Sequence, residues 1–146
     1  LDDIDLELNE TPHYGMSTYD YHVDGRGVQY SSWRRPILNM RPDYRHEFGA
    51  VWQFPADLHL VDWLHAKGFA FDVLTDHDVH EEGAALLYHY AVVISPSHAE
   101  YSSAQMLDAY EHYLADGGRG MYLGANGFYW VASRHPTKPW LIEVRK

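Results

Sequence analysis

The sequence predicts an α/β domain with a mainly parallel sheet. From residue 51 onward, short apolar segments typical of strands alternate with segments of helical periodicity. Gly and Pro residues stand between these segments, as expected where helices and strands end. Strands that alternate with helices imply βαβ crossovers, which place parallel strands side by side. Ligands of such sheets lie beyond the carboxyl ends of the strands, so candidate site residues are expected there.

Helices are predicted over residues 55–67, 76–87 and 102–116. The first has Pro in its first turn, an apolar face, and a Gly just after its end. The second has an acidic first turn. The third is the clearest, because Ser102 and Gln105 form a capping box and an apolar stripe follows them.

Strands are predicted over residues 69–74, 90–95, 121–123 and 140–144. The first three follow or precede a predicted helix, so we expect them to be parallel neighbours. The last, WLIEV, is expected to be an edge strand or the start of a hairpin.

The chain is predicted to divide near residue 50. Residues 1–50 contain several Gly and Pro residues and show no helical period, although 14–21 could hold a short strand. The segment is rich in Tyr, Trp and Arg, so we expect it to be an ordered, irregular segment that packs on the core. Residues 51–146 are expected to form that α/β core.

Composition narrows the classes of function. The 146 residues suit about one domain, and the net charge of −10 argues against nucleic acid and anionic membrane surfaces. The sequence has no Cys, which excludes disulfides, thiolate metal ligands and a Cys nucleophile, and which fits a cytoplasmic protein. No apolar run approaches the roughly 20 residues of a membrane span.

Polar residues follow three of the predicted strands, at 75–78, 97–100 and 124–127. If the strands are parallel neighbours, the three clusters face one crevice. His98 and Glu100 lie two residues apart, so in extended chain both side chains project to one side, toward one metal or water. The alternative is that Glu100 stabilises the following helix through its dipole while His98 is solvated.

Asn126 lies between Gly124 and Gly127, after a short apolar strand. A sharp strand-to-helix elbow needs such glycines, and an elbow Asn can hold a carbonyl oxygen by hydrogen bonds. The alternative is a plain left-handed turn, because Asn and Gly both tolerate positive φ.

Residues 76–82 form the densest cluster of potential metal ligands. A His/carboxylate site with Asp76, His77 and His80 is one interpretation. The other is a helix start with Asp76 as its cap and carboxylates near the positive end of the dipole. Tyr14, Tyr19 and Tyr21 are, taken singly, typical of amphipathic core or rim residues.

The stretch SPSHAEYSSAQMLDAYEHYLADGGRGMYLGANGFYW resembles the central core of the large, catalytic subunit of N,N-dimethylformamidase. The resemblance is most specific over residues 90–130, and STYDYHVDG and FAFDVLTDHD fit more loosely. It implies a three-layer, class I glutamine-amidotransferase-like fold. It also implies hydrolysis of N,N-dimethylformamide to dimethylamine and formate.

The resemblance further implies a mononuclear iron, Fe(III), held by two Tyr phenolates and one Glu. Tyr19 is the best match for one Tyr ligand, and Tyr21 is the alternative match. Glu100 matches the Glu ligand. His98 and Asn126 match catalytic residues beside the metal. The other Tyr ligand would lie before residue 1, and a further acidic catalytic residue would lie beyond residue 146.

Asn126 occupies the elbow where ordinary amidotransferases carry Cys, so the resemblance implies that a metal activates the amide or a water. His98 would then pass a proton to the leaving amine. The partners implied are a small amide substrate, a small helical subunit and further large subunits. The alternative function is a catalytically inactive amidotransferase-like domain that binds a partner or has a structural role.

Overall fold

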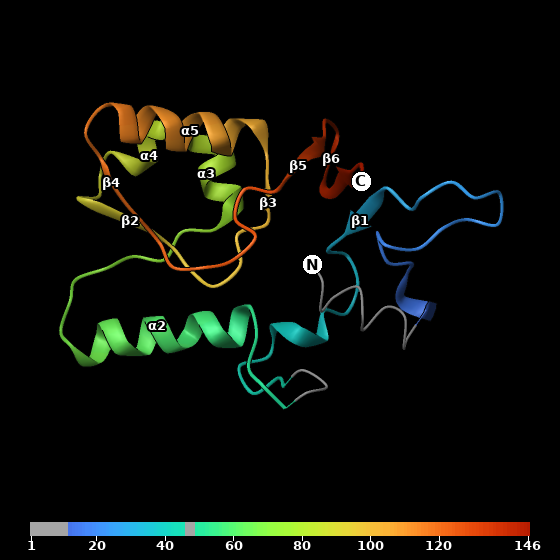
Figure 1. Ribbon diagram of the computed structural model, residues 1–146, viewed down its shortest axis with the longest axis horizontal. Helices are drawn as coiled ribbons and strands as arrows, with labels where there is room; N and C mark the ends of the chain where they lie inside the picture. Colours follow the sequence, from blue (N-terminus) through green and yellow to red (C-terminus); the bar gives the residue numbers. More distant parts are fainter. Residues whose placement is uncertain (1–11, 46–48) are drawn as a thin grey trace. The chain divides into compact units, whose positions relative to one another are not determined.

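The computed structural model describes residues 12–45 and 49–146 (Figure 1). The described residues divide into two compact units, one within 1–56 and 132–146 and one within 57–131. The division near residue 50 and the packing of residues 1–50 on a core stay predictions.

Residues 57–131 hold most of the helices. α2 spans Phe54–Ala66, and α3 and α4 span Asp76–Glu82 and Ala84–Leu87. α5 spans Ala104–Ala115. Within the part of the chain that the structure describes, no helix is long and apolar enough to cross a membrane.

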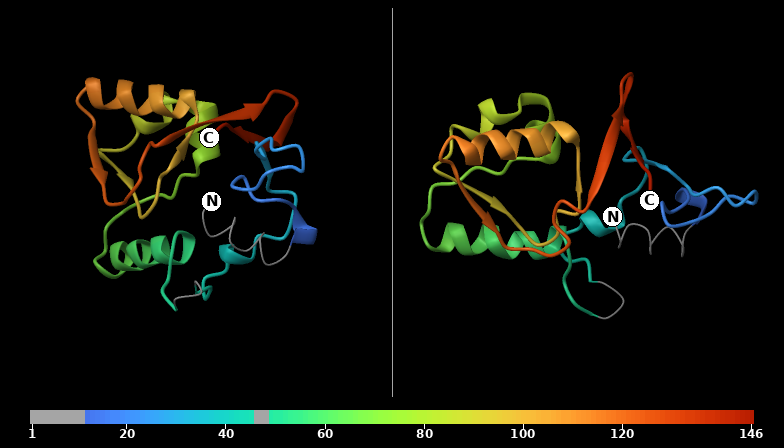
Figure 2. Two further views of the ribbon diagram at one scale, coloured as in Figure 1. Left: turned by 45° about the vertical axis from the view of Figure 1, so that its right-hand side comes forward. Right: turned by 45° about the horizontal axis from the view of Figure 1, so that its top comes forward.

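The strands of this unit form a short parallel pair with helices on one face. β2, Val92–Ser95, pairs in parallel with β4, Arg119–Tyr122. α3, α4 and α5 pack together over one face of this pair (Figures 1 and 2). The core beneath them is an apolar cluster of Val79, Leu87, Met106, Ala109 and Tyr113.

Tyr113 ties α5 to both strands of the pair. The residue is 2% exposed, and its hydroxyl donates to the carbonyl of Tyr90 at 3.0 Å and accepts the Arg119 N–H at 3.2 Å. A Cβ at Gly118 would lie 2.5 Å from the Tyr113 ring, so only Gly allows the chain this close an approach. One buried phenol therefore sets the start of β4 against the segment that leads into β2.

The second sheet is mixed. Its strand order is β1-β6-β5-β3, where β1 spans Tyr30–Ser32, β3 Tyr101–Ser102, β5 Trp130–His135 and β6 Lys138–Val144. β6 is antiparallel to both β1 and β5, whereas β3 is parallel to β5. Two 3₁₀ turns, Pro12–Tyr14 and Leu38–Met40, complete the elements.

The predicted three-layer, class I amidotransferase-like fold with one mainly parallel sheet is wrong. The described residues form a two-stranded parallel pair and a separate mixed sheet. His135 pairs with Lys138, so a two-residue turn joins β5 to β6. Such a turn permits antiparallel pairing alone, since a parallel pair needs a crossover of about a dozen residues or more.

Local signals explain the other differences from the predicted elements. Gly83, with φ of 63°, separates α3 from α4 where one helix was predicted. Thr75, and not Asp76, caps α3, while Ser103, and not Ser102, caps α5. Residues 69–74 are not assigned as a strand.

We predict that Tyr113→Phe destabilises the protein by about 1–3 kcal/mol, because the Arg119 N–H loses its acceptor and the Tyr90 carbonyl loses its donor. Chemical unfolding followed by tryptophan fluorescence measures the change. Tyr88→Phe is the matched control, since Tyr88 is 51% exposed and its hydroxyl bonds to Asp116 at the surface. Equal losses in the two variants would contradict the role assigned to Tyr113.

Candidate functional site

His98 and Glu100 form a buried polar pair. Their side chains are 4% and 5% exposed, and His98 Nε2 lies 3.1 Å from Glu100 Oε2. A carboxylate removed from water needs a hydrogen-bonding or charged partner, and the imidazole supplies one. The two side chains of this predicted cluster therefore lie against each other, and their convergence on a metal or a water stays a prediction.

The loop that carries the pair is held by a carboxylate from α2. Residues 96–100 connect β2 to β3, and the N–H and hydroxyl of Ser97 donate to Asp57 Oδ1 at 3.0 and 2.6 Å. Asp57 lies in the first turn of α2, where a negative charge is favourable. Sequence reasoning did not single out Asp57, because an acidic residue in a first turn does not reveal a bond to a residue 40 positions away.

A second loop lies alongside the first. Backbone N–H groups of residues 123–130 donate to carbonyls of residues 95–100, from Leu123 to Ser95, Ala125 to Ser97, Phe128 to Ala99 and Trp130 to Glu100. Asn126 falls between the second and third of these bonds. The backbone therefore places Asn126 alongside the segment that carries His98 and Glu100.

Asn126 has a left-handed backbone, with φ of 49°, and Phe128 has φ of 59°. Strained residues of this kind cost of order 1–3 kcal/mol each and cluster at functional sites. The Tyr122 hydroxyl accepts the N–H of Gly127 at 2.7 Å, and a Cβ on Gly127 would lie 2.5 Å from the Tyr122 ring. Tyr122 thus holds the turn through its hydroxyl and ring, a role that no sequence pattern indicated.

Gly124 lets the two loops approach each other. A Cβ at this position would lie 2.4 Å from the carbonyl oxygen of Pro96 and 2.6 Å from that of Ser97. These atoms are backbone, so they cannot move aside as a flexible side chain would. A glycine is therefore required at this strand end because of close contact. The predicted strand-to-helix elbow is wrong, since the chain leads from β4 into β5 and Asn126 lies in a left-handed turn.

Aromatic rings border the Asn126 turn. The Phe128 ring lies 5.6 Å from that of Tyr110, edge-on, and 6.0 Å from that of Tyr122. Burial, with a smaller contribution from the charge of Asp76, raises the pKa of Tyr110 to about 12. The Tyr110 phenol therefore stays protonated at neutral pH and is a poor phenolate donor.

Tyr19, the predicted iron ligand, belongs to the other unit. Its side chain is 47% exposed, and Lys146 Nζ lies 2.9 Å from its ring centroid. Tyr21, the alternative Tyr ligand, is 73% exposed and forms an isolated antiparallel β-bridge with Gly27. A site shared by Tyr19 and Glu100 stays a prediction.

Residues 76–82 form a helix start and not a ligand cluster. The Thr75 hydroxyl accepts the Asp78 N–H at 3.3 Å, and the Asp78 carboxylate accepts the Thr75 N–H at 2.8 Å. His80 Nδ1 lies 2.7 Å from Ser103 Oγ. Over residues 12–45 and 49–146, no group of three or more His, Asp or Glu side chains is arranged to hold a metal.

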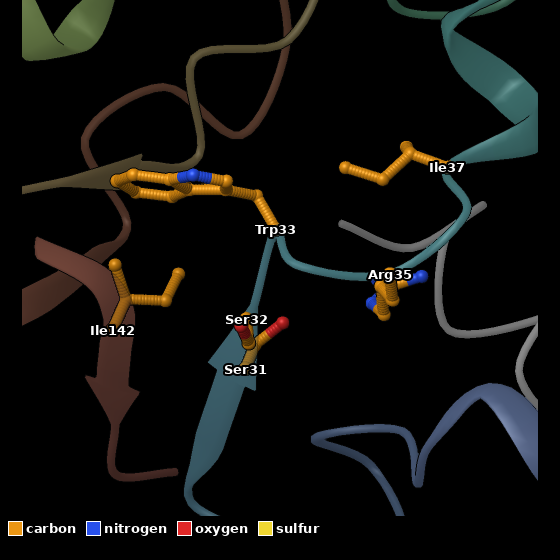
Figure 3. A pocket seen from close by; sticks show the side chains of 6 residues that line it. All are labelled: Ser31, Ser32, Trp33, Arg35, Ile37 and Ile142. Atoms are coloured by element: carbon orange, nitrogen blue, oxygen red, sulfur yellow. The ribbon is translucent and has the colours of Figure 1, made fainter. Parts of the chain in front are cut away.

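A small hollow lies elsewhere, in the unit of residues 1–56 and 132–146. Its volume is about 90 Å³, and its lining includes Trp33, Arg35, Ile37 and Ile142 (Figure 3). Pockets for small molecules usually measure about 300–1,000 Å³, so this hollow is too small to be a good candidate site. It contains none of the predicted site residues.

Known proteins resemble the chain over its whole length. A family described as "N,N-dimethylformamidase beta subunit-like, C-terminal" matches residues 9–146. The N,N-dimethylformamidase beta subunit of Paracoccus aminophilus is 60% identical over 147 residues, which are 100% of this chain and 19% of that protein. The N,N-dimethylformamidase beta subunit of Alcaligenes sp is 58% identical over 147 residues, again 100% of this chain and 19% of that protein. The chain spans about a fifth of the length of these curated relatives.

These matches correct the resemblance drawn from the sequence. The relatives are beta subunits, and the matching family describes a C-terminal part. The prediction of the central amidotransferase-like domain of a large catalytic subunit is therefore wrong.

We predict that Gly124→Ala separates the two loops and destabilises the protein by about 1–3 kcal/mol, as overpacking does. Thermal unfolding measures the loss. Gly27→Ala is the control, because a Cβ there meets no atom within 4 Å and its φ is ordinary. A Gly124→Ala protein as stable as the control would show that the loops do not approach this closely.

Proposed function

Because the chain belongs to the family of N,N-dimethylformamidase beta subunit-like proteins, we propose that it forms part of a hydrolase of small N-substituted amides, N,N-dimethylformamide first among them. The observation that carries the proposal is the buried pair of His98 and Glu100 alongside the strained turn at Asn126. A buried carboxylate and a left-handed Phe128 next to the Asn126 turn both cost stability, so a site is the better explanation.

A mononuclear Fe(III) fits the donor chemistry of these residues in part. Glu100 offers a buried, hard carboxylate oxygen, the kind of donor that suits a ferric ion. Tyr19 would add a phenolate. When bound, such an ion polarises an amide carbonyl or lowers the pKa of a water.

The protein's own residues have distinct proposed roles. A proton on His98 Nε2 would donate to Glu100 Oε2 and so hold the carboxylate in one orientation. In its protonated form His98 would also pass the proton of its other ring nitrogen, Nδ1, to the nitrogen of the leaving amine and so become neutral. The side-chain amide of Asn126 would orient the substrate carbonyl by hydrogen bonding.

We also propose that the protein acts within an assembly. The relatives are named as subunits, so each of them works with at least one other chain. A small helical subunit is the partner that we predict.

We call the polypeptide that contains residues 1–146 the parent polypeptide. The proposal predicts that it binds iron and shows a phenolate-to-iron absorption band in the visible range. Glu100→Gln should lose most of the iron, because the amide replaces a negative ligand with a neutral one. Tyr19→Phe should abolish or strongly shift the band. Metal analysis and visible spectra of the purified proteins measure both effects.

His98→Gln and a His77→Ala, His80→Ala double variant are the matched controls, and both should retain iron. Loss of iron in His98→Gln would make His98 a ligand instead of a proton donor. A parent polypeptide without iron, after growth with ample iron, would contradict the metal site and favour a binding or structural domain.

A further inference from the structure

The sequence has three positions where Asp or Asn directly precedes Gly, namely Asp24–Gly25, Asp116–Gly117 and Asn126–Gly127. At such a pair the backbone nitrogen of the Gly can attack the side-chain carbonyl carbon of the residue before it, because Gly has no Cβ to obstruct the approach. A neutral Asn amide reacts more readily than an ionised Asp carboxylate, and Asn is among the thermolabile residues. Asn126–Gly127 is therefore the most reactive of the three pairs.

In all three pairs the Gly N–H is held in a hydrogen bond. The N–H groups of Gly25 and Gly117 donate to main-chain carbonyls three residues earlier, at 2.8 and 3.1 Å, as in ordinary turns. The Gly127 N–H donates instead to a side chain, the hydroxyl of Tyr122, at 2.7 Å. A nitrogen must lose its proton and its hydrogen bond before it attacks, so this bond opposes the reaction at Gly127.

The ring of Tyr122 packs against the same glycine. A Cβ built on Gly127 would lie 2.5 Å from a ring carbon and 2.7 Å from the hydroxyl oxygen. The Phe128 ring, with its centroid 6.0 Å from that of Tyr122, packs beside it. Asn126 is exposed, so water has access to its side chain. The backbone nitrogen is thus restrained although the amide that it would attack is accessible.

We propose that Asn126–Gly127 is a site of spontaneous deamidation, which the hydrogen bond from the Gly127 N–H to Tyr122 suppresses. In the reaction the Gly127 nitrogen forms a bond to Cγ of Asn126, and the bond from Cγ to the side-chain nitrogen breaks. The proton of the Gly127 N–H leaves with that nitrogen as ammonia, and a cyclic imide remains. Water then opens the imide at one carbonyl to give Asp, or at the other to give isoaspartate.

The modification would change the chemistry of the turn. Both products carry a negative charge in place of a neutral amide. A carboxylate accepts hydrogen bonds but donates none, so it could not donate one to a substrate carbonyl. This consequence rests on the proposed function of Asn126, whereas the modification itself does not. Tyr122 is thus assigned a protective role, without contact to substrate.

Peptide mass spectrometry of the parent polypeptide, stored at neutral pH and physiological temperature, tests the proposal. Deamidation raises the mass of the peptide that contains Asn126, and isoaspartate elutes as a separate peak of the same mass as the Asp product. We expect the native protein to deamidate several-fold more slowly than the urea-unfolded protein. Tyr122→Phe should deamidate about two- to tenfold faster than the unsubstituted protein, which is the factor that corresponds to one net hydrogen bond.

Tyr129→Phe is the matched control, because it removes the hydroxyl of another exposed Tyr in the same loop. Tyr129 is 68% exposed, and its main-chain N–H, which the substitution keeps, donates to the Glu100 carbonyl at 3.1 Å. This variant should deamidate at the unsubstituted rate. Asp116–Gly117 is an internal reference in every digest, since its hydrogen bond is main-chain and does not involve Tyr122.

Three results would overturn the proposal. Native and unfolded protein could deamidate at Asn126 at the same rate, which means that the fold gives no protection. Tyr122→Phe could react no faster than Tyr129→Phe, which means that the hydroxyl is not the restraint. Isomerisation at Asp116–Gly117 could rise as much as deamidation in Tyr122→Phe, which means that the variant loosens the whole unit. Absence of iron or of amide turnover contradicts the proposed function but leaves these rates unchanged, so the two failures are distinguishable.

Discussion

The burial of Glu100 beside His98 is the constraint on which the rest of the site depends. A carboxylate that is 5% exposed is costly unless its partner stays in place, and removing one member of a buried pair typically costs about 3–5 kcal/mol. The pair therefore depends on the loop of residues 96–100 keeping its position. Asp57 holds it from α2, and the hydrogen bonds from residues 123–130 hold it from the other side.

The position of the loop of residues 96–100 in turn depends on an unusual second loop, residues 123–130. The two backbones come so close at Gly124 that a Cβ would overlap carbonyl oxygens. The chain then turns through left-handed residues at Asn126 and Phe128, with the Tyr122 hydroxyl on the N–H between them. Such strain persists only where the surroundings over-determine it. Here the main-chain hydrogen bonds to residues 95–100 and the Tyr122 hydroxyl hold the turn in this conformation.

Much of this was predictable from local sequence signals. Helical periodicity located α2 and α5, and short apolar runs located β2 and β4 to within a few residues. The spacing of His98 and Glu100 indicated that their side chains converge. Gly124 and Asn126 marked a sharp turn.

What could not be predicted depends on contacts between distant residues. The pairing of β6 with β1 joins residues more than 100 positions apart, and no periodicity reports it. The bond from Ser97 to Asp57 is similarly non-local. The two-residue turn after His135 joins β5 to β6 as an antiparallel pair, which the alternation of helices and strands did not reveal. The resemblance named N,N-dimethylformamidase, whose beta subunits are similar to this chain, but it assigned the wrong subunit and fold.

The central claim is that His98 and Glu100 form part of the centre where an amide is hydrolysed. Steady-state turnover of N,N-dimethylformamide by the assembled parent protein tests it most directly, with Glu100→Gln and His98→Gln compared with the surface control Ala115→Lys. The account predicts that both site variants lose at least about a hundredfold in kcat, as expected for a lost acid–base or ligand group, while the control keeps its activity. Site variants that fold and turn over at the rate of the control would contradict the claim.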